Sequence, residues 1–183
     1  MSIKKNVTPE DIIRARRVRL RDLAMAETLV IRIIVIAAFA FVVFGLIFGI
    51  APMKGSDMEP ELSQGDLLIY YRVGRSFAHN EIVIMERDGS RYVGRIIALP
   101  GETVNISDSG VINIDGNNIV ESDIFFDTLP YQSSGRYPLT LGADEYFVLG
   151  DKRDTAKDSR YFGAVKGSEI IGRVITSVHR TGM

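Results

Sequence analysis

The sequence predicts a mainly β domain that follows a single membrane-spanning helix. Eighteen consecutive uncharged residues, from Ile33 to Ile50, are enough to cross about 30 Å of hydrocarbon as a helix. After Pro52, short runs rich in valine, isoleucine and tyrosine are separated by glycine, aspartate and asparagine. This pattern is typical of strands joined by turns. No helical periodicity of useful length follows the apolar run.

Residues 1–28 are predicted to form a basic cytoplasmic segment next to the membrane. Thr8, Pro9 and the acidic pair Glu10–Asp11 are typical of a helix start, where a capping hydroxyl precedes a proline in the first turn. Up to Arg32 the chain has eight lysine and arginine residues against four acidic ones. Because positively charged flanks are retained on the cytoplasmic side, this excess places the N-terminus in the cytoplasm.

Residues 29–50 are predicted to be an uncleaved transmembrane anchor. The apolar part of a cleavable signal sequence is usually about 7–15 residues long and ends in a small-x-small site. This run is longer, and Pro52 makes the sequence at its end a poor cleavage site. The expected location is therefore the cell membrane, crossed once, with residues 51–183 as an extracellular domain.

The extracellular domain is expected to consist of strands around a core of its own. Asp115-Gly116 favours a tight hairpin turn. Residues 121–141, which contain several prolines, serines and glycines, are expected to form an irregular insertion. The predicted strands are Leu67–Val73, Glu81–Met85, Tyr92–Leu99, Val111–Ile114, Glu145–Leu149 and Ile170–Val178.

Composition excludes several classes of function. The chain has no cysteine, so disulfides and thiol chemistry are absent. Its two histidines, His79 and His179, are too far apart in sequence to suggest a metal site, and we expect neither a metal nor another cofactor. From Ala51 onward nineteen acidic residues face fourteen basic ones. Such a domain is poorly suited to nucleic acid, whose binding depends on neutralising phosphates.

Three motifs follow one another in this domain. They are Lys54–Leu62 followed by Gly65-Asp66, then Arg91–Glu102, and then Gly150–Arg153 together with Asp158–Gly163. In register and spacing the motifs resemble those of type I signal peptidases. The resemblance covers nearly the whole chain from the anchor onward, and it implies a signal-peptidase-like complex β fold outside the membrane.

Type I signal peptidases cleave with a serine that a lysine activates, and the resemblance places these two roles on Asp57 and Gly94. Attack of a carboxylate on a peptide carbonyl would give an unstable anhydride, and glycine has no side chain to act as base. The serine that supports the lysine in many members corresponds to Ala156, and the usual asparagine of the last motif to Lys152. Because nucleophile, base and support are all replaced, we expect no Ser–Lys catalysis and no enzyme.

Two rescue mechanisms, which would make the chain an unconventional signal-peptidase-like protease, are the weaker alternative. Ser56 with Lys54 would be a displaced dyad, but a shift by one residue turns Ser56 to the face opposite Asp57. Asp57 with Asp158 would share a proton, as paired carboxylates do in aspartic proteases. However, Asp158 is expected to be a structural partner of Arg160.

The remaining charged motif residues are expected to maintain the scaffold. We predict a partly buried ion network of Arg95, Arg153, Asp158 and Arg160. Asp151, which follows Gly150, is expected to lie at a turn, where aspartate bonds local backbone.

The resemblance implies that a partner binds as an extended strand, by β-augmentation, between the nucleophile segment and the strand Ile82–Met85. Gly94 is expected to leave a space where the lysine stem of the family packs. An amine from a partner would fill that space beside Asp57. The predicted groove residues are Asp57, Met58, Pro60, Leu62, Ile82, Val83, Ile84 and Gly94.

The sequence also resembles the signal-peptidase-like accessory proteins that are encoded with Gram-positive pilus genes, those of streptococci in particular. That resemblance implies an assembly factor or chaperone for pilin subunits, acting alongside a sortase. A regulatory partner of a true signal peptidase or of a sortase is a further alternative.

Overall fold

The computed structural model describes residues 9–121, 124, 127–131 and 137–179. The chain separates into an N-terminal unit up to Gly45 and a β-rich unit from Leu46 onward. The predicted cap Thr8 lies outside the described residues.

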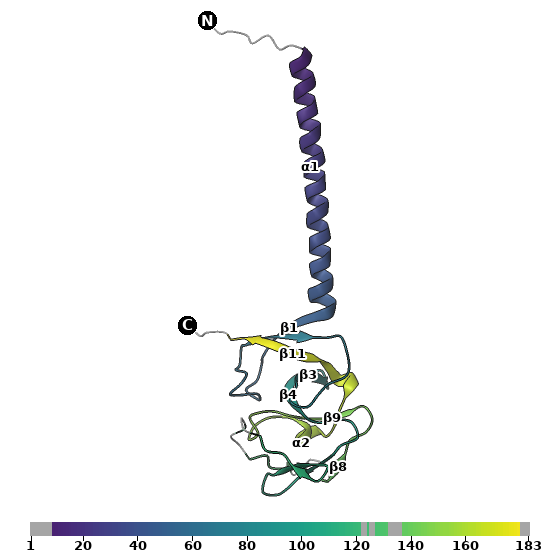
Figure 1. Cartoon of the computed structure of the whole chain (residues 1–183). Helices are drawn as coiled ribbons and strands as arrows, with labels where there is room; N and C mark the ends of the chain where they lie inside the picture. Colours follow the sequence, from purple (N-terminus) through teal and green to yellow (C-terminus); the bar gives the residue numbers. More distant parts are fainter. Residues whose placement is uncertain (1–8, 122–123, 125–126, 132–136, 180–183) are drawn as a thin grey trace. The chain divides into compact units, whose positions relative to one another are not determined.

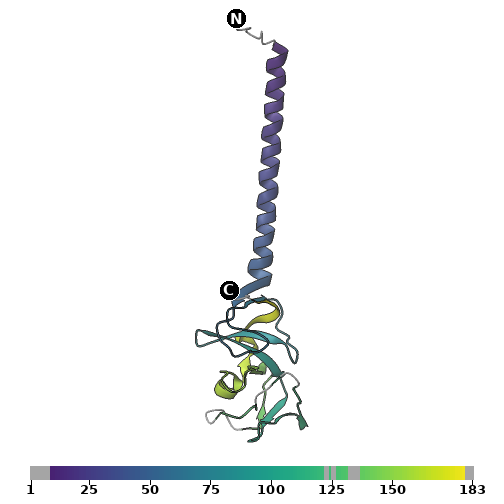
Figure 2. The same ribbon diagram turned by 90° about the vertical axis from the view of Figure 1, so that its left-hand side faces the viewer.

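The N-terminal unit is one continuous helix, α1 (Pro9–Val42), which Figures 1 and 2 show in purple to blue. Pro9, the first described residue, is already part of this helix. The helical stretch Arg16–Ile47 is long and apolar enough to cross a membrane. A turn of π-helix, Val43–Ile47, ends the helical stretch.

Strand β1 (Phe48–Pro52) begins inside the predicted anchor, so residues 48–50 of the predicted span 29–50 belong to a sheet. β1 pairs with β2 (Leu67–Tyr71), and Gly49 lies opposite Tyr70. A Cβ at Gly49 would overlap the Tyr70 ring, so a larger residue here would require the Tyr70 side chain to move. Hydropathy alone does not separate an apolar strand from the end of an apolar helix.

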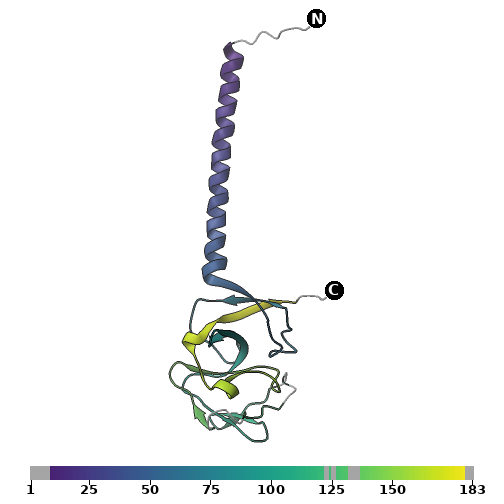
Figure 3. The same cartoon turned by 180° about the vertical axis from the view of Figure 1, so that it is seen from behind.

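Two antiparallel sheets form the β-rich unit. The larger has the strand order β1-β2-β11-β3-β4-β9-β10, and the smaller has the order β7-β6-β5-β8. Figures 1 and 3 show the smaller sheet at the end of this unit that lies away from β1 and β11. The other elements are β3 (Ile82–Arg87), β4 (Ser90–Ala98), β5 (Thr103–Ile106), β6 (Ile112–Ile114), β7 (Asn117–Asn118), β8 (Leu139–Thr140), β9 (Glu145–Leu149), α2 (Ser159–Phe162), β10 (Val165–Lys166), the 3₁₀ turn Gly167–Glu169 and β11 (Ile170–Val178).

The mainly β architecture predicted from the sequence is confirmed. The predicted strands Glu145–Leu149 and Ile170–Val178 have the observed bounds. At the predicted hairpin turn Asp115 and Gly116 have φ values of 49° and 85°, as a type I′ turn requires. The sequence pattern does not indicate β1, β5, β7, β8 or β10, and β8 lies within the predicted irregular insertion 121–141.

The core consists of three groups of buried apolar side chains, and β3 contributes to two of them. Val83 and Met85 pack in one group with Val148, whereas Ile84 packs in another group with Met58. Alternate residues of a strand point to opposite faces. Only the face of β3 that carries Ile84 is therefore available to the motif that contains Met58.

Candidate functional site

Asp57 lies in the segment that follows β1, just before the chain makes a single turn. Met58 and Leu62 anchor this turn, because their side chains are 0% and 3% exposed in the core. The Leu62 N–H donates to the Met58 carbonyl at 2.9 Å. Asp57 itself stays half-buried, and Pro60 is exposed. Met58 and Leu62, which the sequence predicts to be groove residues, are therefore core residues that hold Asp57 in place.

The backbone of Asp57 packs directly against the third motif. Its carbonyl accepts a hydrogen bond from the Lys152 N–H at 2.9 Å. A Cβ at Gly150 would lie 2.7 Å from the Asp57 carbonyl oxygen and would overlap the Ala156 methyl. The positions of the family's nucleophile and supporting serine thus meet at Gly150.

Gly94 also packs at this point, but it faces no empty space. It is buried in β4 opposite Val83 of β3. A Cβ at Gly94 would lie 2.6 Å from Val148 Cγ1 and 3.1 Å from the Leu149 carbonyl oxygen. The predicted space for a lysine stem or a partner's amine is filled by Val148, so that prediction is wrong. Since Val148 and Leu149 precede Gly150, the three positions that the resemblance assigns to the nucleophile, the lysine and the supporting serine converge on the end of β9.

The negative charge of Asp57 is only partly balanced by the positive groups around it. Burial raises the pKa of Asp57, and the negative charge of Asp158 raises it further, whereas the Lys157 N–H and the positive charge of Lys152 lower it. The Lys152 ammonium forms its ion pair with Glu59 instead, at 2.9 Å. Among the ion pairs of the described residues, none includes Asp57.

Asp158 has the structural role predicted for it. Its carboxylate accepts hydrogen bonds from Arg160 Nη2 at 2.8 Å and from the Gly150 N–H at 3.1 Å. Asp158 and Arg160 are each 1% exposed. A proton shared with Asp57 would compete with these donors, so the arrangement does not favour an aspartic-protease-like pair.

The predicted ion network is divided into separate groups around Arg95, Arg153 and Arg160, and Arg95 also pairs with Glu61 at 2.5 Å. Arg95 binds Asp151 through two hydrogen bonds of 2.9 and 2.6 Å. Arg153 binds Glu121 through two hydrogen bonds of 2.8 and 2.6 Å. Asp151 is thus an ion-pair partner as well as a turn residue, and Glu121 is a partner that the sequence does not indicate.

Residues 127–131 pack against the segment Gly150–Gly163, which contains the third motif, through contacts that the sequence pattern does not predict. Arg160 donates to the Leu129 carbonyl at 3.2 Å and lies 4.8 Å above the centre of the Tyr131 ring. The Tyr131 hydroxyl donates to the Ala156 carbonyl at 2.9 Å. The insertion has no periodicity that would identify these residues.

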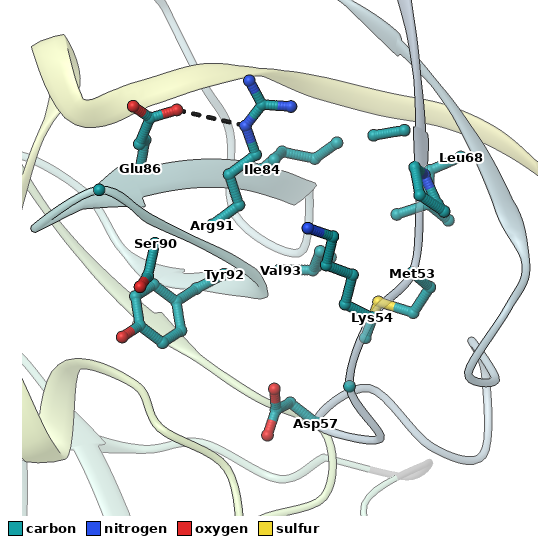
Figure 4. A pocket seen from close by; sticks show the side chains of 14 residues that line it. Met53, Lys54, Asp57, Leu68, Ile84, Glu86, Ser90, Arg91, Tyr92 and Val93 are labelled. Carbon is teal, nitrogen blue, oxygen red and sulfur yellow. Dashed lines mark hydrogen bonds and ion pairs between the residues drawn. The ribbon is translucent and has the colours of Figure 1, made fainter.

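A groove of 560 Å³ lies next to Asp57, and Figure 4 shows the side chains that line it. Leu68 and Ile84 give it an apolar floor. Residues 51–55 form one wall, and Arg91–Val93 at the start of β4 form another. The lining residues are Ala51, Pro52, Met53, Lys54, Gly55, Asp57, Leu68, Ile84, Glu86, Gly89, Ser90, Arg91, Tyr92 and Val93.

The strand with a free edge along this groove is β4. β3 is paired with β4 along its length and with β11 at Val83–Met85, so this part of β3 has no free edge for a further strand. Within the described strands, β9 begins to pair with β4 only at Arg95, which leaves residues 90–94 paired on one side. The prediction that a partner lies beside Ile82–Met85 is wrong, because sequence does not reveal strand order. Of the predicted groove residues, only Asp57 and Ile84 line the groove.

This geometry does not support a displaced catalytic dyad of Ser56 and Lys54. Lys54 lines the groove, whereas Ser56 does not. The Ser56 carbonyl accepts the Glu59 N–H at 3.1 Å as the chain turns away.

Comparison with known proteins agrees with the motif resemblance. Residues 26–179 match the family described as signal peptidase, peptidase S26. The chain is 30% identical to signal peptidase I of Bacillus licheniformis over 147 residues, which are 70% of this chain and 74% of that protein. It is 27% identical to signal peptidase IB of Staphylococcus aureus over 163 residues, which are 77% and 85% of the two chains. A crystal structure of signal peptidase I from Enterococcus faecalis matches with a TM-score of 0.43 and 30% identity, over 55% of this chain and 97% of that one.

Proposed function

The chain belongs to the peptidase S26 family of signal peptidases, and from this premise we propose that it binds an extended peptide without cleaving it. The observation that carries the proposal is the convergence of Asp57, Gly94 and Ala156 on the end of β9. In the family these positions would hold the serine, the lysine and the supporting serine. A carboxylate, a glycine and a methyl group supply neither the serine nucleophile nor the lysine that would activate it.

The groove supports binding by β-augmentation. Backbone groups of residues 90–94 are free on one side among the described strands, and they can pair with an extended peptide. The apolar floor made by Leu68 and Ile84 would receive alternate side chains of that peptide. Backbone pairing gives affinity, and the pockets for side chains give selectivity.

The proposed location is the cell membrane, with the helical stretch Arg16–Ile47 as the anchor. Its length and apolar character support a single crossing. The excess of lysine and arginine up to Arg32 supports a cytoplasmic N-terminus and an extracellular β domain.

The proposed partners are pilin subunits, which the chain would present to a sortase as an assembly factor or chaperone. Support comes from the resemblance of the sequence to the signal-peptidase-like accessory proteins of Gram-positive pilus genes. An extracellular, membrane-anchored groove would meet a pilin precursor as it leaves the membrane.

We expect no cleavage by membranes that contain the full-length chain, whether the substrate is a secretory preprotein or the co-expressed pilin precursor. The assay compares the wild type with Asp57→Ala and Ser56→Ala, and an active signal peptidase is the positive control. Processing that occurs with the wild type and disappears in either variant would identify a catalytic residue and overturn the proposal.

A further inference from the structure

We infer that the groove selects a peptide that carries a lysine side chain, whose ammonium group pairs with the Asp57 carboxylate. This inference rests on the proposed function, because it concerns the same groove. It names the chemistry that distinguishes the preferred peptide from others.

The charges along the groove leave Asp57 as an available anion. Glu86 and Arg91, which also line it, form an ion pair with each other at 3.2 Å. Lys54 comes from the same segment as Asp57, but Figure 4 shows its side chain extending away from the Asp57 carboxylate. No ion pair of the described residues joins the two.

The groups outside the groove compensate the charge of Asp57 only in part, since the Lys157 N–H and the positive charge of Lys152 lower its pKa. Lys152 forms its ion pair with Glu59, and Asp158, which is an anion itself, forms one with Arg160. A carboxylate that is partly desolvated without a cation is unfavourable, and an ammonium group brought by a peptide would provide a charge-assisted hydrogen bond. The inference therefore follows from the position of Asp57 at the groove and from the lack of an ion pair to Asp57 among the described residues. The Lys157 ammonium, on the neighbouring loop, lies 5.1 Å from the centre of the Tyr161 ring.

The lysine side chain of the peptide must approach Asp57 from the groove. The alternative route, through the side of β4 that carries Gly94, is closed because Val148 occupies it. The carboxylate lies between the groove wall and the third motif, since its Oδ2 lies 2.8 Å from the position of a Cβ on Gly55 and it accepts a hydrogen bond from the Lys157 N–H. A long, flexible side chain with a terminal cation fits this approach better than a short one.

The raised pKa of Asp57 also predicts how the stability of the folded chain depends on pH. A carboxyl group whose pKa is raised in the folded chain holds its proton more tightly there than in the unfolded chain. Ionised Asp57 therefore lowers the stability as the pH rises from the ordinary aspartate range through the raised pKa. Asp57→Asn should unfold at a higher temperature than the wild type near neutral pH, and the difference should vanish in acid. Retention of a destabilising charge is typical of a functional site.

The test measures the affinity of the full-length chain in lipid nanodiscs for capped peptides of alternating valine and serine. One residue at a time is replaced by lysine or by norleucine, its uncharged counterpart. We expect the lysine peptide to bind about tenfold more tightly than the norleucine peptide in one register, as for a charge-assisted hydrogen bond. The preference should be lost in Asp57→Asn and should weaken as the pH falls. Asp154→Asn is the matched control, since it removes one exposed carboxylate of the loop between β9 and α2, which does not line the groove.

Each outcome has a distinct meaning. Lysine preference in the wild type and in Asp154→Asn, absent from Asp57→Asn, supports the inference. Equal binding of lysine and norleucine peptides overturns the inference and leaves the groove as a peptide site. Failure of every peptide to bind overturns both the inference and the proposed function. A preference that survives in Asp57→Asn assigns the selectivity to another group and overturns the inference.

Discussion

Asp158→Ala is expected to lower the free energy of unfolding by about 3–5 kcal/mol, because it leaves the guanidinium of a buried arginine without its anion. Arg160 is 1% exposed and donates to Asp158 through both Nε and Nη2. The same carboxylate accepts the Gly150 N–H and caps the short helix α2. Thermal unfolding of the full-length chain in detergent micelles should show a decrease in Tm of about 10 °C.

Asp154→Ala is the control for this measurement. Asp154 is an exposed carboxylate on the same loop, and its removal should change the stability by no more than about 0.5 kcal/mol. Equal stability of Asp158→Ala and Asp154→Ala would show that the Asp158–Arg160 pair does not hold the third motif in place.

Gly94→Lys is expected to destabilise the chain by about 2–3 kcal/mol, because β4 has no room for a side chain at this position. The new Cβ would meet Val148 Cγ1 at 2.6 Å and the Leu149 carbonyl oxygen at 3.1 Å. Restoring the family's lysine therefore requires a second change. Val148→Ala removes the Cγ1 atom that stands in the way.

A double-mutant cycle measures this relation. Val148→Ala alone should cost about 2 kcal/mol as a cavity, but it should cost about 1–2 kcal/mol less in the Gly94→Lys chain. Val165→Ala is the matched control, since Val165 is 1% exposed in the same apolar group and does not contact the new Cβ. Additive effects of Gly94→Lys and Val148→Ala would mean that Val148 does not fill the position of the lysine stem.

The strands could be predicted where side-chain type and turn chemistry agree. Glu145–Leu149 and Ile170–Val178 are rich in residues that favour strands, and Asp115-Gly116 has the dihedrals that its sequence favours. β1 could not be separated from the anchor, because Phe48–Ile50 continue the apolar run without a change in hydropathy. Its strand conformation depends on pairing with β2, which is a tertiary contact.

The sequence motifs identify residues of the site, but they do not predict how these residues are arranged in space. Asp57 and Asp158 were placed by their motifs, and the structure brings both to the end of β9. The free edge of β4 depends on strand order, and the filling of the Gly94 position depends on the packing of Val148. Neither is encoded by local spacing. The contact of Tyr131 with the Ala156 carbonyl joins residues of the insertion and the third motif, and no local pattern in the sequence indicates it.

Site-specific photocrosslinking tests most directly whether the groove binds a partner. A photoreactive phenylalanine derivative replaces Lys54, which lines the groove, or Lys166, an exposed lysine of β10, in membranes that also contain the pilin precursor. We predict a crosslinked adduct with the precursor from position 54 that is absent from position 166 and is reduced by an excess of the lysine-containing peptide. Failure of position 54 to give an adduct, or an equal yield from both positions, would contradict binding in the groove.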